Sequence, residues 1–115
     1  MHLSDAPKIE APGLRTVHKF IDEGMGAKQF GAMMVEYESE ISTTKVHFHE
    51  KRESAYIILD GEGSMKLNGV DYELGPGMVV FLSPSDHHGI VCTGPDGLKM
   101  IEIWSPLGKD RIDVE

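Results

Sequence analysis

The sequence has almost none of the features that mark membrane, secreted or disulfide-stabilised proteins. Its single cysteine, Cys92, excludes an internal disulfide and agrees with a reducing compartment, so we expect a cytoplasmic protein. No apolar run approaches the roughly 20 residues needed to cross a bilayer. The N-terminal segment MHLSDAPKIEAPG shows no basic patch followed by an apolar stretch. With 115 residues, the chain is expected to form one soluble domain.

Positive charge is also scarce. The chain has 11 Lys and Arg against 19 Asp and Glu, a formal net charge of −8 at pH 7, and its largest basic cluster is Lys51-Arg52. DNA, RNA or an acidic membrane surface would meet net repulsion, so we expect neither nucleic acid nor a membrane as a partner. A small anionic substrate is not excluded, because a buried divalent cation can dominate the potential of its own pocket.

Helical periodicity is nearly absent, and Gly, Pro, Asn or Asp interrupts the chain every eight to twelve residues, which is typical of an all-β sandwich or barrel. Asn68-Gly69 predicts a type I′ hairpin. Further turns are expected at 75–77, 83–86 and 94–97, where proline would end the strands. The predicted strands are 14–21, 29–38, 43–49, 54–60, 63–68, 70–74, 78–82, 88–92 and 98–104. They form a barrel over 14–107, preceded by an extended arm at 1–13 and followed by a charged, exposed tail at 108–115.

The chemistry is concentrated in the segment VHFHEKRESAYIILDGEG. Residues two apart on a strand share a face, so His47 and His49 would project two imidazoles side by side. On the inner face of a barrel such a pair needs partners for its ring nitrogens, and a metal ion can serve both. The alternative is two solvent-facing histidines on a polar strand face.

A second source of imidazole lies about forty residues later, in GPGMVVFLSPSDHHGIVC. An HxH pair with an acid nearby, a Gly-bounded hairpin and then G…P…H resembles the two-motif pattern of the cupin superfamily, over roughly residues 30–104. The resemblance implies a double-stranded β-helix, or jelly-roll barrel, holding one divalent metal ion. Two His and a Glu come from the first motif and one His from the second. Aligning the second motif puts His88, rather than His87, at the ligand position.

The sequence leaves two possibilities for the residue at the carboxylate position of the metal site. Glu53 lies four residues after His49, as in the shorter form of the first motif, whereas counting back from Gly61 puts Ser54 at the ligand position. Either a bulge turns Glu53 inward, or water completes a three-histidine site. We favour Glu53. Glu50 is a weaker candidate for this ligand, because Glu50, Lys51 and Arg52 are expected to form a solvated turn.

Four further residues are candidates for the pocket. Tyr56 lines it if Ser54 does, and His87 is either a substrate contact or an exposed turn residue. Cys92 shares a face with His88 if the strand is regular, although an inert buried thiol is the commoner case. Glu102 is a candidate catalytic acid or base if its face of the strand Leu98–Trp104 points inward. If the opposite face is interior, Glu102 is an ordinary surface charge.

A nitrogen and oxygen ligand set suits Mn, Fe, Ni, Co or Zn. The function we favour is an enzyme, an isomerase or lyase, acting on a small oxygen-rich metabolite such as a sugar, uronate or carboxylic acid that coordinates the metal. The alternatives are a non-catalytic ligand-binding or sensor cupin, a non-haem iron dioxygenase, or a purely structural metal site. The extended arm and a hydrophobic closing strand favour a homodimer.

Overall fold

A computed structural model describes residues 1–114, and nearly all of its regular structure is strand. The only helices in that range are two single 3-10 turns, so no helix there is long and apolar enough to cross a membrane. The elements, in chain order, are η1 (Leu3–Asp5), β1 (Lys8–Ala11), β2 (Arg15–Ile21), η2 (Glu23–Met25), β3 (Gly31–Tyr37), β4 (Val46–His49), β5 (Glu53–Leu67), β6 (Val70–Leu74), β7 (Val79–Leu82), β8 (His88–Ser105) and β9 (Arg111–Val114).

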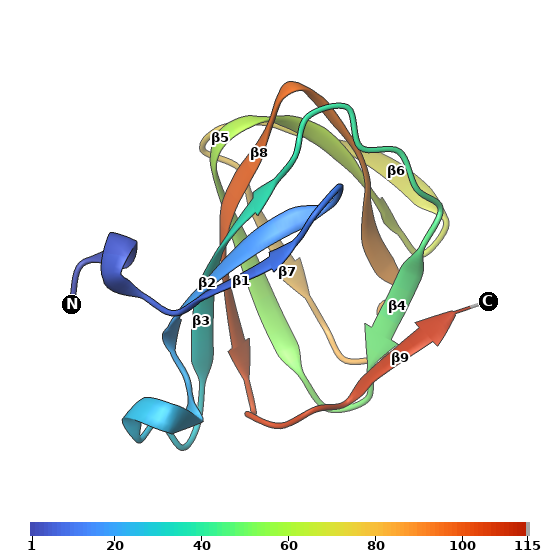
Figure 1. The fold of residues 1–115 in the computed structure, drawn as a ribbon. Coiled ribbons are helices and arrows are strands. Elements are labelled where there is room, and N and C mark those ends of the chain that lie inside the picture. Colours follow the sequence, from blue (N-terminus) through green and yellow to red (C-terminus); the bar gives the residue numbers. More distant parts are fainter. Residues whose placement is uncertain (115) are drawn as a thin grey trace.

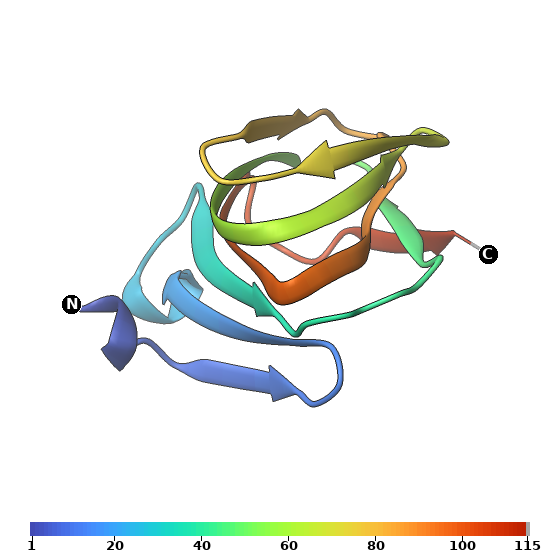
Figure 2. The same ribbon diagram turned by 90° about the horizontal axis from the view of Figure 1, so that it is seen from above.

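The strands form one antiparallel sheet that curls into a barrel, which confirms the predicted jelly-roll class (Figures 1 and 2). Its main path runs β1-β2-β3-β8-β4-β9, and β5 pairs with β8 while also carrying β6 and β7. The pairing of β5 with β8 is the longest, from Glu53 opposite Ser105 to Leu67 opposite His88. These two strands wrap around the barrel and connect its layers.

β5 and β8 each merge two strands that the sequence analysis had separated. The turn predicted at 94–97 does not end a strand, because β8 bends there and continues. Gly97 adopts a φ of +73°, and the carbonyl oxygen of Tyr37 approaches it where a side chain would stand. Opposite Gly97, the register of β5 against β8 shifts between Gly61 and Gly63. Glycines and bulges let the paired strands turn a corner without losing their hydrogen bonds.

The core follows from the alternation of side chains along each strand. On β5, Tyr56 and Ile58 point inward and are 5% and 1% exposed. They pack with inward residues of the other strands and of the far end of β5, namely Val17, Val35, Met65, Leu74, Leu82, Ile90, Leu98 and Met100. The hairpin at Asn68-Gly69 is confirmed, with φ of +49° and +84° at its two central residues, as a type I′ turn requires.

Both ends of the described chain contribute strands that the sequence analysis did not include. Within the predicted arm, β1 pairs with β2 and extends the sheet. Within the predicted tail, β9 pairs with β4, the strand that carries the first two histidines. The charged side chains of β9 are exposed, as expected, but the strand itself adds a wall beside the histidines.

The outer face of the sheet is unusually apolar. Phe81 of β7 lies opposite Ala55 of β5, which lies opposite Ile103 of β8. Phe81 is 59% exposed, and its neighbour Val79 is 67% exposed. An exposed apolar patch on a sheet face is typical of an association surface.

The corner at Gly97 generates a stability prediction. Gly97→Ala should lower the free energy of unfolding by about 1–3 kcal/mol, because alanine at a positive φ is strained and its methyl group would collide with the Tyr37 carbonyl. Urea unfolding followed by circular dichroism measures the change. Gly75→Ala is the matched control, since nothing lies within 4 Å of the added methyl group there. Equal stability of the two variants would contradict this account of the bend.

Candidate metal centre

Three histidines from two distant parts of the chain meet at one end of the barrel. His47 and His49 share a face of β4, and His88, the first residue of β8, is the cross-strand partner of His47. One ring nitrogen of each lies within 4.8 Å of the others. The ring centroids of His47 and His88 are 4.4 Å apart. This cluster could hold a metal ion. It consists of the three histidines that the sequence analysis selected.

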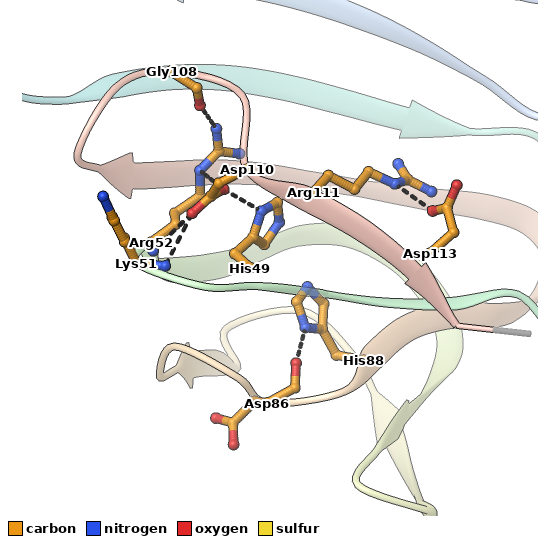
Figure 3. Close-up of polar contacts among 9 residues, drawn as sticks. All are labelled: His49, Lys51, Arg52, Asp86, His88, Gly108, Asp110, Arg111 and Asp113. Carbon is orange, nitrogen blue, oxygen red and sulfur yellow. Dashed lines mark hydrogen bonds and ion pairs between the residues drawn. The ribbon is translucent and has the colours of Figure 1, made fainter.

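Hydrogen bonds orient two of the three rings. The Nδ1 of His88 donates to the carbonyl oxygen of Asp86 at 2.8 Å, and the Nδ1 of His49 donates to the Asp110 carboxylate at 2.7 Å (Figure 3). Since carbonyl and carboxylate oxygens accept here, each Nδ1 carries the proton. The Nε2 lone pairs of His49 and His88 are therefore left for a metal.

Asp110 is fixed from several directions. Its second carboxylate oxygen accepts the backbone N–H groups of Lys51 and Arg52 at 3.0 and 3.2 Å. Desolvation opposes ionisation of this carboxyl, but the hydrogen bonds from Lys51 and His49 outweigh it and lower the pKa of Asp110. The ionised carboxylate thus ties β9 to the loop after β4 and holds the His49 ring.

The cluster's own environment keeps the imidazoles neutral. Burial lowers the pKa of His47 to about 3, with the neighbouring His88 and Arg111 adding to the effect. Burial also lowers the pKa of His49 and of His88. Neutral imidazole is the form that binds a metal, so this donor set fits a divalent ion of the Mn, Fe, Ni, Co or Zn group.

The structure corrects the choice of Glu53 as the fourth ligand. Glu53 is exposed and lies outside the histidine cluster, whereas Ser54 points inward and is 5% exposed. The bulge needed to turn Glu53 inward is absent there, since β5 stays in register with β8 from Glu53 to Ile58. Glu50 is likewise not part of the cluster. Within residues 1–114, the side chains brought together that could hold a metal ion are the three histidines.

A cavity of about 570 Å³ opens beside the histidines. His47 and His49 form part of its wall, and Tyr56 and Glu102, which lie opposite each other on β5 and β8, form another part. The face of β8 that carries Glu102 is therefore the inner one. Burial raises the pKa of Glu102, and burial together with the nearby Glu102 raises the pKa of Tyr56.

Two other predicted pocket residues lie elsewhere. Cys92 is exposed, because β8 carries an extra residue, Val91, between the paired positions Ile90 and Cys92. This bulge reverses the face on which Cys92 lies, and the thiol contacts the Ser64 hydroxyl at 2.8 Å. His87 is also exposed and stacks on the ring of Phe48, outside the cavity. Neither side chain lines this cavity, where a substrate contact was expected.

The sequence analysis missed several charged residues of the site. Arg111 reaches it from the start of β9 and Asp110 from the residue before that strand. Arg52 reaches it from the loop after β4, and Arg15 from the start of β2. Arg52 lies over the ring of Trp104, 5.3 Å from its centroid. The alternation Arg111-Ile112-Asp113-Val114 is a strand signal that was available, but nothing in it reveals which strand it pairs with.

Comparisons with known proteins agree with this geometry. A family model described as Cupin domain matches residues 33–104. L-ectoine synthase of Bordetella parapertussis is 36% identical over 77 residues, which cover 63% of this chain and 58% of that protein. The matched part of the chain thus spans less than two thirds of the length of these curated relatives.

Solved structures extend the comparison over the whole fold. The polyketide cyclase RemF from Streptomyces resistomycificus is 30% identical with a TM-score of 0.82, covering 100% of this chain and 84% of that one. KdgF from Halomonas sp. is 20% identical with a TM-score of 0.76, covering 92% of this chain and 91% of that one. The latter likeness supports the fold alone.

The role of Asp110 gives a prediction for metal affinity. Asp110→Asn should weaken Zn²⁺ binding about ten- to a hundred-fold, because an amide holds the His49 ring less firmly and does not increase its basicity. Glu53→Gln is the matched control and should leave affinity unchanged, since Glu53 faces solvent. Isothermal titration of chelator-treated protein measures both. A larger loss in Glu53→Gln than in Asp110→Asn would contradict this arrangement.

The lowered histidine pKa values give a prediction for stability. In the unfolded chain these rings bind protons below a pKa of about 6.5, while folded His47 resists protonation down to about 3. Metal-free protein should therefore keep its full stability above about pH 6.5 and lose stability as the pH falls below it. Urea unfolding in chelator at about pH 8 and about pH 5 measures the change. The pH dependence should be shallower in His47→Gln, and an identical dependence would be evidence against burial of a neutral ring.

Proposed function

This chain belongs to the cupin family, and we propose that it is a metal-dependent enzyme acting on a small oxygen-rich metabolite. The observation that carries the proposal is that a cavity of about 570 Å³ has two histidines of the cluster, His47 and His49, and the inward carboxyl of Glu102 in its wall. A purely structural metal site is typically closed by four protein ligands, whereas catalytic sites keep positions open beside a pocket. Three protein ligands and an adjacent titratable group favour catalysis.

The proposed role of each residue follows from its position in the site. His47, His49 and His88 would hold the ion, which when bound supplies a Lewis acid for a carbonyl or carboxylate oxygen. Glu102 takes a proton from the substrate carbon that lies next to the carbonyl group. Its pKa is raised by burial, toward the range in which a carboxyl group can both accept and return a proton. Burial raises the pKa of Tyr56, so it stays a neutral phenol that can donate a hydrogen bond to a substrate in the pocket.

The reaction class we favour is proton abstraction followed by ring closure or loss of a leaving group, a lyase or cyclase reaction. Support comes from the relatives, since a structure 30% identical over the whole of this chain is that of a polyketide cyclase. The curated relatives at 36% identity are L-ectoine synthases, which agrees with an enzyme. The substrate of this chain follows from neither name.

The test is exchange of substrate protons. Zinc-, manganese- and iron-loaded protein is incubated in D₂O with a panel of oxo acids, hydroxy acids and sugar acids, and deuterium incorporation or loss of water is followed by NMR. Glu102→Gln should slow the reaction about a hundred- to ten-thousand-fold while metal content stays unchanged. Glu36→Gln, whose carboxylate pairs with Lys99 outside the cavity, is the control. Binding of panel members without exchange would favour a ligand-binding or sensor cupin instead.

We also propose that the protein is a homodimer, associated through the apolar outer face around Phe81. A second copy of the same face can cover it, because an isologous pairing buries identical apolar patches on both partners. Light scattering should give twice the chain mass of 12.7 kDa. Phe81→Lys should shift the protein toward monomer, while Met25→Lys, an exposed apolar residue on η2, should not. A wild-type protein that is monomeric at micromolar concentration would contradict the proposal.

A further inference from the structure

The cavity beside the histidines has a charge opposite to that of the protein. The whole chain carries −8, yet the cavity wall includes five basic and three acidic side chains. The basic ones are Arg15, Lys19, Arg52, Lys109 and Arg111, and the acidic ones are Glu102, Asp110 and Asp113. A local excess of positive charge in an acidic protein favours an anionic occupant.

Two of the arginines already have acidic partners. The Nε of Arg111 donates to Asp113 at 2.9 Å, and the Nε of Arg52 lies 3.6 Å from Asp110 (Figure 3). Asp110 in turn is committed to His49. These pairs offset the charges of Arg111 and Arg52.

Arg15 is different. Its side chain donates one hydrogen bond, from Nη1 to the Tyr37 hydroxyl at 3.4 Å, and among residues 1–114 no carboxylate lies within 4.0 Å of it. Its guanidinium group lies 5.9 Å from the centroid of the Tyr37 ring. Tyr37 does not neutralise it, because burial raises the pKa of Tyr37 and keeps the phenol protonated. Most of the five N–H donors of Arg15 therefore have no partner within the described chain.

The position of Arg15 is rigid and close to the reactive groups. It begins β2 and pairs with Ala11 of β1 on one side and Tyr37 of β3 on the other. It lines both the cavity that contains Glu102 and an adjoining hollow of about 500 Å³, and His47 also lies on both. A ligand held at Arg15 would therefore share a cavity with the histidines and with Glu102.

We propose that Arg15 binds a carboxylate group of the substrate, so that the substrates are small carboxylic acids whose reacting group lies at the histidine end of the cavity. The planar fork of a guanidinium group matches a carboxylate with two parallel hydrogen bonds. This inference rests on the proposed function, since it assigns the substrate class of the same site. Arg15 thereby acts as a specificity-determining residue.

The competing explanation is that Arg15 only balances the buried charge of Glu102. Arg15 is the largest favourable charge acting on that carboxyl. The two explanations differ in what they predict for ligands. A counter-charge to Glu102 would influence acids and their uncharged analogues alike, whereas a carboxylate-binding residue would distinguish them.

The experiment uses Trp104, the single tryptophan of the chain, which lines the cavity and reports binding by its fluorescence. Zinc-loaded protein is titrated with pyruvate and levulinate, each compared with its primary amide, and with methyl phosphate. At least one acid should bind about ten-fold or more tightly than its amide. Arg15→Gln should weaken binding of that acid about ten- to a hundred-fold and leave the amide nearly unchanged. Arg15→Lys should recover part of the loss.

Lys99→Gln is the matched control, because Lys99 pairs with Glu36 outside the cavity and its loss should change neither affinity. Zinc affinity is measured for every variant and should be the same in wild type and Arg15→Gln. The inference is overturned if neither acid is preferred over its amide, if Arg15→Gln weakens acid and amide equally, or if methyl phosphate binds more tightly than both acids. An acid preference without deuterium exchange would support the Arg15 assignment while contradicting the proposed enzyme, so the two failures are distinguishable.

Discussion

The antiparallel pairing of β5 with β8 is the interaction on which the rest of this structure depends. At one end it presents His88 beside His47 of β4, and nearer the other end it sets Tyr56 opposite Glu102. The inner faces of these strands also supply much of the buried core, including Ile58, Leu98 and Met100. His88, the pocket residues Tyr56 and Glu102 and much of the core are therefore positioned by the same backbone hydrogen bonds. A shift of one residue in this register would turn the inner side chains of one of the two strands outward.

Burial is the physical cause shared by the electrostatic features of the site. It keeps the three imidazoles neutral, raises the pKa of Glu102 and holds Tyr56 as a phenol. The same low-polarity surroundings strengthen the interaction of any ion with the remaining charges, because screening by water is reduced. A protein with a net charge of −8 can thus present a positive cavity, provided that its basic side chains gather on the inner wall.

The segments outside the family match also contribute residues to the site. The match covers residues 33–104, which include the three histidines, Tyr56 and Glu102. Arg15, on β2, lies before it, and Asp110 and Arg111, at the start of β9, lie after it, where Asp110 immediately precedes the strand. The matched part of the fold carries the histidine cluster, while the flanking segments shape the charge of the cavity and the orientation of His49.

The sequence by itself determined the features that depend on local periodicity. His47 and His49 share a face because strand side chains alternate, and Asn68-Gly69 forms a hairpin because both residues tolerate a positive φ. The second motif selected His88, which lies beside these two histidines. Only the tertiary structure decided the features that depend on register between distant strands. A bulge at Val91 turned Cys92 outward, its absence near Glu53 left Ser54 facing inward, and the pairing of β9 with β4 delivered Asp110 to His49. A bulge or a strand partner is chosen by the total free energy of packing across the barrel, which no short stretch of sequence contains.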